Sequence, residues 1–377
     1  MKSKILSNLI IGAGPAGLAT AGRLRKMNIP FEILEQSDKI ANAWHHHYDR
    51  LHLHTVNEFS HLPHMNFPEG FPIYVPKREL VKYYEYYATH YEIKPHFNQT
   101  VNSIKKSGDN WKVQTSSGQT FLAENVIIAT GKNRVENKPK WKGQDQFRGD
   151  LVHSRNYKNP KPFLGQKVLV VGMGNTGAEI ALDLSEFNVE TYISVRSPVS
   201  IVPRDVNGRP VQITAKKMAK LPFGLGDWLG IQIRRFLIGD LTKYGLKTDP
   251  TPPAVLLRET GKTSVIDIGT VAAIKAGKIK VLPDIEGFYG SGIQFKNGEK
   301  IDFDTVILAT GYHAQVEDFV ENVSGLFDKN NLPKFPIGQG AQKGLFFVGF
   351  DNYKLGGILG TIYDDSETVA EAIQKNQ

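Results

Sequence analysis

The chain has 377 residues, 40% of them hydrophobic, which exceeds one ordinary hydrophobic core and predicts two domains. It contains no cysteine, and this excludes a disulfide framework, a thiolate metal site and a Cys-x-x-Cys redox pair. The formal net charge of +8 suits a protein that holds phosphorylated cofactors or acidic substrates. No long run of like charge supports a nucleic-acid partner, and no stretch approaches the roughly 20 apolar residues of a membrane span, so we expect a cytoplasmic protein.

Residues 8 to 24, NLIIGAGPAGLATAGRL, combine a short apolar run, a Gly-x-Gly-x-x-Gly turn and a helical pattern. In such a turn Gly12 permits the bend, Gly14 lets the backbone approach a pyrophosphate, and Gly17 lets helix and strand pack closely. We therefore expect a dinucleotide to be bound by Gly12, Gly14, Ala16 and Gly17.

The next apolar strand, FEIL, ends in Glu35, which follows Gly12 by 23 residues. A carboxylate at that distance accepts hydrogen bonds from ribose hydroxyls. Glu35 therefore indicates an adenosine with an unmodified ribose.

Five of the eleven histidines lie within residues 45 to 54, HHHYDRLHLH. The segment alone fits a metal site, a run of solvated imidazoles or the wall of another active centre. If the chain is extended there, Arg50, His52 and His54 share one side. Arg50 then either binds a substrate carboxylate or forms an ion pair with Asp49.

His61 and His64 have a spacing that a metal could use, but without thiolates we favour a structural or solvated role and expect no metal site.

A second copy of the glycine pattern occupies residues 167 to 184, KVLVVGMGNTGAEIALDL. Its predicted phosphate-binding residues are Gly172, Gly174, Asn175, Thr176 and Gly177. Each half also ends in a strand followed by glycine, NVIIATG up to Gly131 and DTVILATGY at 304 to 312, and we expect Gly131 to contact the cofactor of the first half.

The strand after the second copy ends in Arg196, 24 residues beyond Gly172, where the first copy has an acid. A guanidinium stacks on adenine and pairs with a 2′-phosphate, which favours NADPH over NADH in this half. The alternative is a solvated arginine. Arg204, in IVPRD, either helps to hold NADPH or is an exposed loop cation.

These patterns predict an α/β protein with two Rossmann-like dinucleotide-binding domains, FAD in the first and NADPH in the second. The FAD domain is discontinuous, at 1–155 and 312–377, and the NADPH domain occupies 156–311. A partly helical insert at about 204–262 has apolar residues at helical spacing with basic residues between them. It either covers a substrate cleft, makes a subunit contact in a homodimer, or lies on a membrane surface.

Between the two glycine patterns, Phe147, Gly149, His153 and Tyr157 form the sequence Phe-x-Gly-x-x-x-His-x-x-x-Tyr. This resembles the fingerprint of class B flavoprotein monooxygenases in their flavin-containing monooxygenase form. Baeyer–Villiger enzymes usually carry Trp at the last position. The segments YDRLHLH and FSHLPHMNFPEGFPIYVPK resemble the YUCCA-type branch, the indole-3-pyruvate monooxygenases.

The resemblance implies that NADPH reduces FAD and that O₂ then gives a C4a-(hydro)peroxyflavin, which oxygenates a small substrate. That substrate is either a soft nitrogen or sulfur compound or an aromatic 2-oxo acid such as indole-3-pyruvate. The alternatives are an NADPH oxidase or reductase that does not oxygenate, a Baeyer–Villiger monooxygenase, and a non-catalytic redox sensor.

The resemblance also implies roles for individual residues. Trp44 matches a tryptophan beside the flavin, with core packing as the alternative. His54 stands where relatives that oxidise amines place an asparagine, so we expect it on the flavin-facing wall of the first domain. With Arg50 and Asn175, His54 forms the predicted catalytic set.

Overall fold

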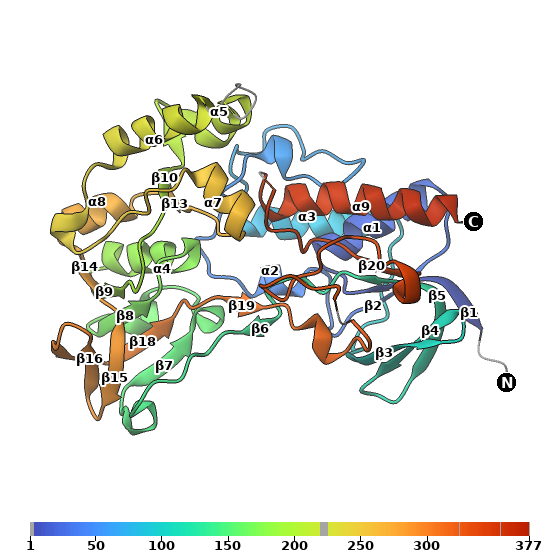
Figure 1. Cartoon of the computed structure of the whole chain (residues 1–377), viewed down its shortest axis with the longest axis horizontal. Coiled ribbons are helices and arrows are strands. Elements are labelled where there is room, and N and C mark those ends of the chain that lie inside the picture. Colours follow the sequence, from blue (N-terminus) through green and yellow to red (C-terminus); the bar gives the residue numbers. More distant parts are fainter. Residues whose placement is uncertain (1–3, 219–224, 324, 355, 377) are drawn as a thin grey trace. The chain divides into compact units, whose positions relative to one another are not determined.

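The structure is a computed structural model that describes residues 4–218, 225–323, 325–354 and 356–376. The chain divides into two compact units (Figure 1). Unit 1 comprises Met1–His46, Thr55–Val135 and Tyr312–Gln377, and unit 2 comprises His47–His54 and Glu136–Gly311.

Unit 1 contains a mixed sheet in the order β2-β1-β5-β4-β3, with β20 also paired to β5. Its parallel part joins β1 to β2 and β5, and β5 to β20, while β3, β4 and β5 pair antiparallel. Its strands are β1 (Ile5–Ile11), β2 (Glu32–Leu34), β3 (Val101–Ser107), β4 (Asn110–Thr115), β5 (Thr120–Ile128) and β20 (Leu345–Phe347).

The helices of unit 1 are α1 (Pro15–Lys26), α2 (Asn42–His45), α3 (Lys77–His90) and α9 (Gly357–Lys375). Figure 1 shows α9 running alongside α1, and α1 also contacts α3. The buried face of α1 begins at Ala16 and includes Leu18 and Leu24, which are fully buried. The glycine turn therefore leads from the buried strand β1 directly into a buried helix.

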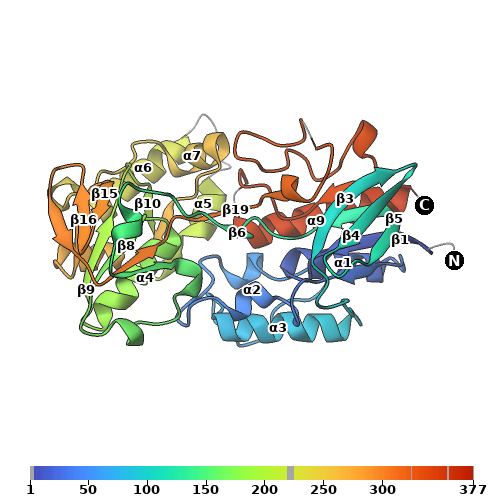
Figure 2. The same ribbon diagram turned by 90° about the horizontal axis from the view of Figure 1, so that it is seen from below.

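Unit 2 is built on a fully parallel sheet in the order β14-β9-β8-β18-β7. Its strands are β7 (Asp150–His153), β8 (Lys167–Val171), β9 (Glu190–Ser194), β14 (Ile279–Leu282) and β18 (Thr305–Leu308). Helix α4 (Asn175–Glu186) packs on β8 and β9 (Figure 2). Helix α8 (Thr270–Lys275) packs on β14.

The strand β8 has a buried core on each face. Val168 and Val170 join the apolar cluster that includes α4, whereas Leu169 and Val171 join a second cluster. That second cluster includes the antiparallel strands β15 (Ile285–Tyr289), β16 (Gly292–Phe295) and β17 (Lys300–Asp302). The continuous apolar run of β8 is explained by this burial on both sides.

The predicted insert at about 204–262 is partly helical, and its residues 219–224 lie outside the described ranges. Its described helices are α5 (Val211–Met218), α6 (Leu225–Ile238) and α7 (Pro253–Thr260). It also contains the short strands β11 (Asp205–Val206) and β12 (Arg209–Pro210), and it is flanked by β10 (Ile201–Pro203) and β13 (Val265–Asp267). β10 pairs parallel with β13, so the insert begins and ends beside neighbouring strands of unit 2.

The units differ from the predicted division in two places. Residues 136–155 belong to unit 2, because β7 pairs along its whole length with β18. The segment His47–His54 also belongs to unit 2, because Tyr48 and Leu51 pack into the core around α4. The short strand β6 (Val135–Glu136) pairs with β19 (Tyr312–His313).

The α/β class with parallel strands is confirmed. Among the residues that the structure describes, no helix is long and apolar enough to cross a membrane.

Candidate functional site

The first glycine turn has the geometry of a phosphate cradle. Gly12 has a φ of 106°, which favours glycine, and a Cβ there would lie 2.8 Å from the carbonyl oxygen of Ala129. A Cβ on Gly17 would lie 1.9 Å from the carbonyl oxygen of Gly12. A Cβ on Gly14 would meet nothing within 4 Å. Two glycines are therefore required by packing, while Gly14 leaves open space at the amino end of α1.

The second turn repeats this geometry. Gly172 has a φ of 101°, a Cβ on Gly177 would lie 2.0 Å from the carbonyl oxygen of Gly172, and Gly174 faces open space. Neither α1 nor α4 has a side-chain cap at its first residue, so no cap competes with a ligand for the N–H groups of the first turn.

The acid predicted to bind ribose is held against the first turn. Glu35 is buried, and its Oε2 accepts a hydrogen bond of 2.7 Å from the backbone N–H of Ala13. Its Oε1 accepts hydrogen bonds from the backbone N–H and the hydroxyl of Ser37. The carboxylate is thus fixed beside the glycine turn.

The corresponding residue in unit 2 has different surroundings. Arg196 lies two residues beyond the end of β9 and is exposed. Arg204 is half-buried, and its Nε donates to Asp205 at 3.0 Å. An exposed guanidinium at this strand end can reach a 2′-phosphate, and this role of Arg196 stays a prediction.

The side chain of Asn175, the first residue of α4, is hydrogen-bonded to backbone groups. Its Oδ1 accepts a hydrogen bond of 2.7 Å from the N–H of Ile266, and its Nδ2 donates to the carbonyl of Ser264 at 3.4 Å. Asn175 therefore ties β13 to α4 beside the second glycine turn. Thr176 follows it and is half-buried.

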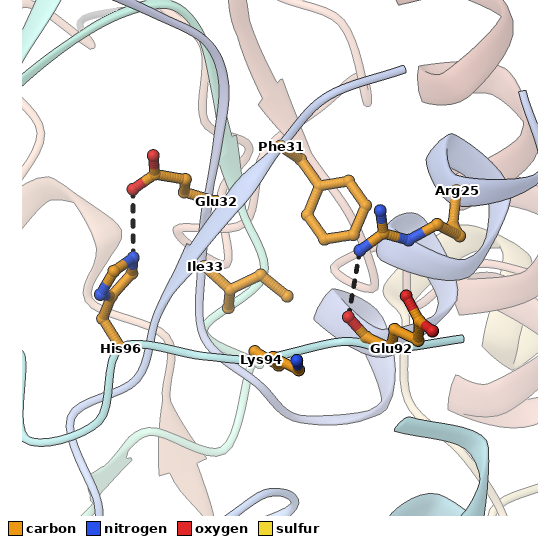
Figure 3. Close-up of a pocket in the computed structure, with 7 residues that line it drawn as sticks. All are labelled: Arg25, Phe31, Glu32, Ile33, Glu92, Lys94 and His96. Atoms are coloured by element: carbon orange, nitrogen blue, oxygen red, sulfur yellow. Dashed lines mark hydrogen bonds and ion pairs between the residues drawn. The ribbon is translucent and has the colours of Figure 1, made fainter. Parts of the chain in front are cut away.

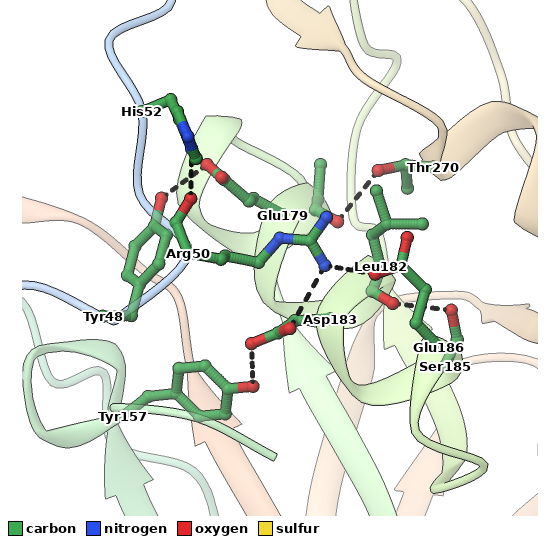
Figure 4. Close-up of polar contacts among 11 residues, drawn as sticks. Tyr48, Arg50, His52, Tyr157, Glu179, Leu182, Asp183, Ser185, Glu186 and Thr270 are labelled. Carbon is green, nitrogen blue, oxygen red and sulfur yellow. Dashed lines mark hydrogen bonds and ion pairs between the residues drawn. The ribbon is translucent and has the colours of Figure 1, made fainter. Parts of the chain in front are cut away.

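The histidine-rich segment docks on α4 (Figure 4). The hydroxyl of Tyr48 donates to Glu179 at 2.7 Å, and Nε2 of His54 lies 3.2 Å from the same carboxylate oxygen. Glu179 is buried one turn beyond Asn175. The structure groups His54 with unit 2, and its expected place on the flavin-facing wall stays a prediction.

Arg50 is anchored farther along the same helix. Its Nη1 lies 3.2 Å from Asp183 and 2.7 Å from Glu186 (Figure 4). Burial opposes the charge of Arg50, but the two carboxylates outweigh it and raise its pKa. The alternative of an ion pair with Asp49 is wrong, because the structure pairs Arg50 with these two carboxylates of α4 instead. A catalytic role for Arg50 stays a prediction.

Tyr157, the last fingerprint residue, joins this network. It is buried, and its hydroxyl donates to Asp183 at 2.7 Å. Burial raises the pKa of Asp183, although the hydrogen bond from Tyr157 and the charge of Arg50 both oppose that rise. One carboxyl of α4 thus holds both the histidine-rich segment and the segment after β7.

The other fingerprint residues also organise unit 2. Nε2 of His153 lies 3.3 Å from the carbonyl oxygen of Gly311, and burial lowers the pKa of His153. A Cβ on Gly149 would lie 2.5 Å from the carbonyl oxygen of Asp304. Phe147 packs on Phe288 with ring centroids 5.5 Å apart. The fingerprint therefore fixes the edge strand β7 and the point where the chain leaves unit 2.

Trp44 lies on the short helix α2 and packs edge-on against Tyr84 of α3, with centroids 6.1 Å apart. It is half-buried, and its predicted place beside the flavin is untested. Gly131 has a φ of 75° and open space around its Cα, as a strand-to-loop turn requires.

Sequence reasoning missed Lys132, which directly follows Gly131. Its ammonium donates to the side chain of Asn352, and burial lowers its pKa to about 8, although the charge of Asp351 opposes this. Because β5 and β20 are parallel, both residues lie at the edge of the sheet that carries the first glycine turn. The available signal was a lysine immediately after the strand-then-glycine segment.

A separate cavity lies near the amino end of β2 (Figure 3). Its lining residues are Arg25, Phe31, Glu32, Ile33, Glu92, Lys94 and His96. Arg25 donates to the carbonyl of Glu92, and His96 contacts Glu32 at 3.1 Å. The carboxyl end of the parallel strands holds the glycine turn, so this cavity lies toward the other end of β2.

Within residues 4–218, 225–323, 325–354 and 356–376, no three His, Asp or Glu side chains are grouped as a metal site requires.

Comparison with known proteins identifies the family. Residues 9–209 match the family model "Pyridine nucleotide-disulphide oxidoreductase". The chain is 39% identical over 363 residues to the probable indole-3-pyruvate monooxygenase YUCCA8 of Arabidopsis thaliana, covering 93% of this chain and 85% of the relative. The chain belongs to the indole-3-pyruvate monooxygenase family.

Solved structures agree on the fold. A flavin-containing monooxygenase from Stenotrophomonas maltophilia is similar with a TM-score of 0.75, at 20% identity and over 99% of both chains. Cyclohexanone monooxygenase from Rhodococcus sp. Phi1, bound to NADP⁺, has a TM-score of 0.74 at 16% identity, covering all of this chain and 86% of the other. The prediction of a flavin monooxygenase of the indole-3-pyruvate type, with two dinucleotide-binding domains, is confirmed at the level of family and fold.

Proposed function

We propose that this chain is an FAD- and NADPH-dependent monooxygenase that decarboxylates indole-3-pyruvate oxidatively in the cytoplasm. The observation that carries the proposal is a pair of matching glycine cradles, one beside a fixed carboxylate and one beside an exposed arginine, in a member of the indole-3-pyruvate monooxygenase family. In the balanced reaction, NADPH supplies two electrons and O₂ supplies two oxygen atoms. One oxygen atom enters the new carboxylate, the other leaves as water, and the original carboxyl carbon leaves as CO₂.

Unit 1 fits FAD. Its open Gly14 lies at the amino end of α1, where N–H groups can bind a diphosphate. Glu35 lies beside that turn, where a carboxylate accepts ribose hydroxyls. The ammonium of Lys132, on the same edge of the sheet, adds a positive charge toward an anionic cofactor.

Unit 2 fits NADPH. Gly174 offers the same open cradle at the amino end of α4, and Arg196 provides a cation where Glu35 provides an anion. The 2′-phosphate that distinguishes NADPH from NADH is attracted by a guanidinium and repelled by a carboxylate.

Bound FAD supplies the transfer of electrons from NADPH to O₂. The residues of the chain bind, orient and protect. Asn175 fixes β13 beside the second cradle, and Glu179 fixes His54 one turn farther along α4. We assign His54 a positioning role in unit 2: its imidazole holds the segment 47–54 on the helix that follows the nucleotide cradle.

The absence of cysteine argues against the disulfide chemistry named in the matching family model. An NADPH oxidase that releases peroxide remains the main alternative. The test is to supply indole-3-pyruvate or a thioether with NADPH and to measure NADPH consumed, product formed and peroxide released. Product from indole-3-pyruvate in proportion to NADPH supports the proposal. Product from the thioether alone assigns soft-heteroatom oxygenation instead, and peroxide equal to NADPH in both arms assigns an oxidase.

A further inference from the structure

Helix α6 of unit 2 presents large apolar side chains to the outside. Among the described residues, the exposed fractions are 57% for Trp228, 41% for Ile233, 88% for Phe236 and 39% for Leu237. At 100° per residue these four positions fall within one half of the helix circumference. An exposed apolar face of this kind marks an interaction surface.

The opposite half of α6 is firmly attached to unit 2. Arg234 is buried, and its guanidinium donates to Ser200 and to the carbonyls of Asp249 and Thr251. Ile238 is buried in the core that includes α4. The apolar face is therefore held outward by a fixed anchor, because turning it inward would break these contacts.

Positive charge is concentrated in the segment of the chain that carries this face. The segment 204–262 has eleven Lys and Arg against five Asp and Glu, a surplus of six, whereas the whole chain has a surplus of eight. Lys217 on α5, Arg235 on α6 and Lys243 beyond it are all exposed. Figure 1 shows α5 beside α6, and the two helices contact each other.

We propose that the α6 face docks this protein on the surface of a membrane that contains anionic lipids. Trp228 and Phe236 enter the boundary between headgroups and acyl chains, and the surrounding lysines and arginines bind the lipid phosphates. Helices with Trp and Phe on one side and basic residues around them lie in the interface in this way. The helix lies on the membrane and does not cross it.

The charge argues for a lipid surface rather than a second copy of the chain. A face-to-face dimer would bring two segments of surplus positive charge together, which is unfavourable without intervening acids. An anionic bilayer complements both the apolar side chains and the charge of the same face.

The test is sedimentation of the full-length, FAD-loaded protein with vesicles of phosphatidylcholine alone or of phosphatidylcholine with phosphatidylserine. We expect binding to the anionic vesicles, weakened by salt. Phe236→Ala should weaken it by about tenfold, since one large apolar side chain leaves the interface. Phe335→Ala is the matched control, because Phe335 is 64% exposed but belongs to unit 1 and not to the segment 204–262.

Lys217→Glu keeps the test decisive if Phe236→Ala folds poorly. It leaves the apolar face intact and should remove the preference for anionic vesicles. No binding by the wild-type protein at low salt, or an equal loss in Phe335→Ala, would overturn the proposal. A dimer in light scattering that Phe236→Ala converts to monomer, without vesicle binding, would assign the face to a second copy and also overturn it.

Discussion

Nε2 of His54 lies 3.2 Å from the Glu179 carboxylate, although 125 residues separate the two in sequence. Glu179 also accepts the Tyr48 hydroxyl, so one buried carboxylate fixes both ends of the segment 48–54. Helix α4, which begins at the second glycine cradle, therefore positions the histidine-rich segment.

Replacing His54 should uncouple NADPH oxidation from oxygenation of the substrate. His54→Ala removes the contact with Glu179 and leaves that buried carboxylate with one partner fewer, so we expect a larger fraction of the NADPH electrons to end as peroxide. His52→Ala is the matched control, because His52 is exposed and its ring Nδ1 contacts the carbonyl oxygen of Arg50. Peroxide per NADPH, measured in both variants, checks this. Equal peroxide from both would show that the Glu179 contact has no role in coupling.

Alanine substitutions in the two cradles should distinguish the glycines that are needed for packing from those that are needed for cofactor binding. Gly14→Ala meets no atom and should fold, but its methyl group occupies the open space and should lower FAD content. Gly174→Ala should keep FAD and raise the KM for NADPH. Gly17→Ala, whose methyl would lie 1.9 Å from a carbonyl oxygen, should fold poorly.

FAD absorbance, NADPH kinetics and thermal unfolding measure these three effects. If Gly14→Ala lost NADPH binding and Gly174→Ala lost FAD, the assignment of the cofactors to the units would be reversed.

Arg196 should set the choice of nucleotide. Arg196→Ala should lower kcat/KM for NADPH by about ten- to a hundredfold and leave NADH nearly unaffected, because a charge-assisted pair with the 2′-phosphate is lost. Arg204→Ala serves as the comparison, since Arg204 is already paired with Asp205. An unchanged NADPH-to-NADH ratio in Arg196→Ala would refute the assignment.

Asp365 should make the protein less stable as the pH rises. Its carboxyl is buried on α9 and accepts the N–H of Gly349, and burial raises its pKa to about 6. A raised pKa means that the folded state holds the proton more tightly, so stability falls as the pH increases from about 4 to about 6. Asp365→Asn keeps an acceptor without the charge. It should therefore raise the free energy of unfolding at neutral pH by up to about 2 kcal/mol.

Urea unfolding from acid to neutral pH measures this difference. Asp364→Asn, at the exposed neighbouring position, should change stability by less than about 0.5 kcal/mol at every pH. Wild-type and Asp365→Asn curves that run parallel would contradict the predicted titration.

The local parts of the fold were predictable from the sequence. The spacing of Gly12, Gly14 and Gly17 reflects contacts within a few residues, so the turn and its helix followed directly. Glu35 and Arg196 could be located because each lies one or two residues beyond the strand that follows its glycine turn.

Placement of the histidine-rich segment was not predictable, because it depends on partners far away in the sequence. Arg50 finds its two carboxylates on α4, more than 130 residues later, and the nearby Asp49 accepts from Asn159 instead. Asn175 shows the same limit: its position in the motif was clear, but its partners come from residues 264–266. Such contacts depend on the packing of the whole unit and leave no periodic pattern in the sequence.

The most direct test of the proposed activity is a reaction of the purified protein with NADPH, indole-3-pyruvate and O₂ labelled with heavy oxygen. We expect indole-3-acetate with one labelled oxygen in its carboxylate, formed in proportion to CO₂ and to NADPH consumed. Unlabelled indole-3-acetate, or peroxide equal to NADPH with no indole-3-acetate, would contradict it.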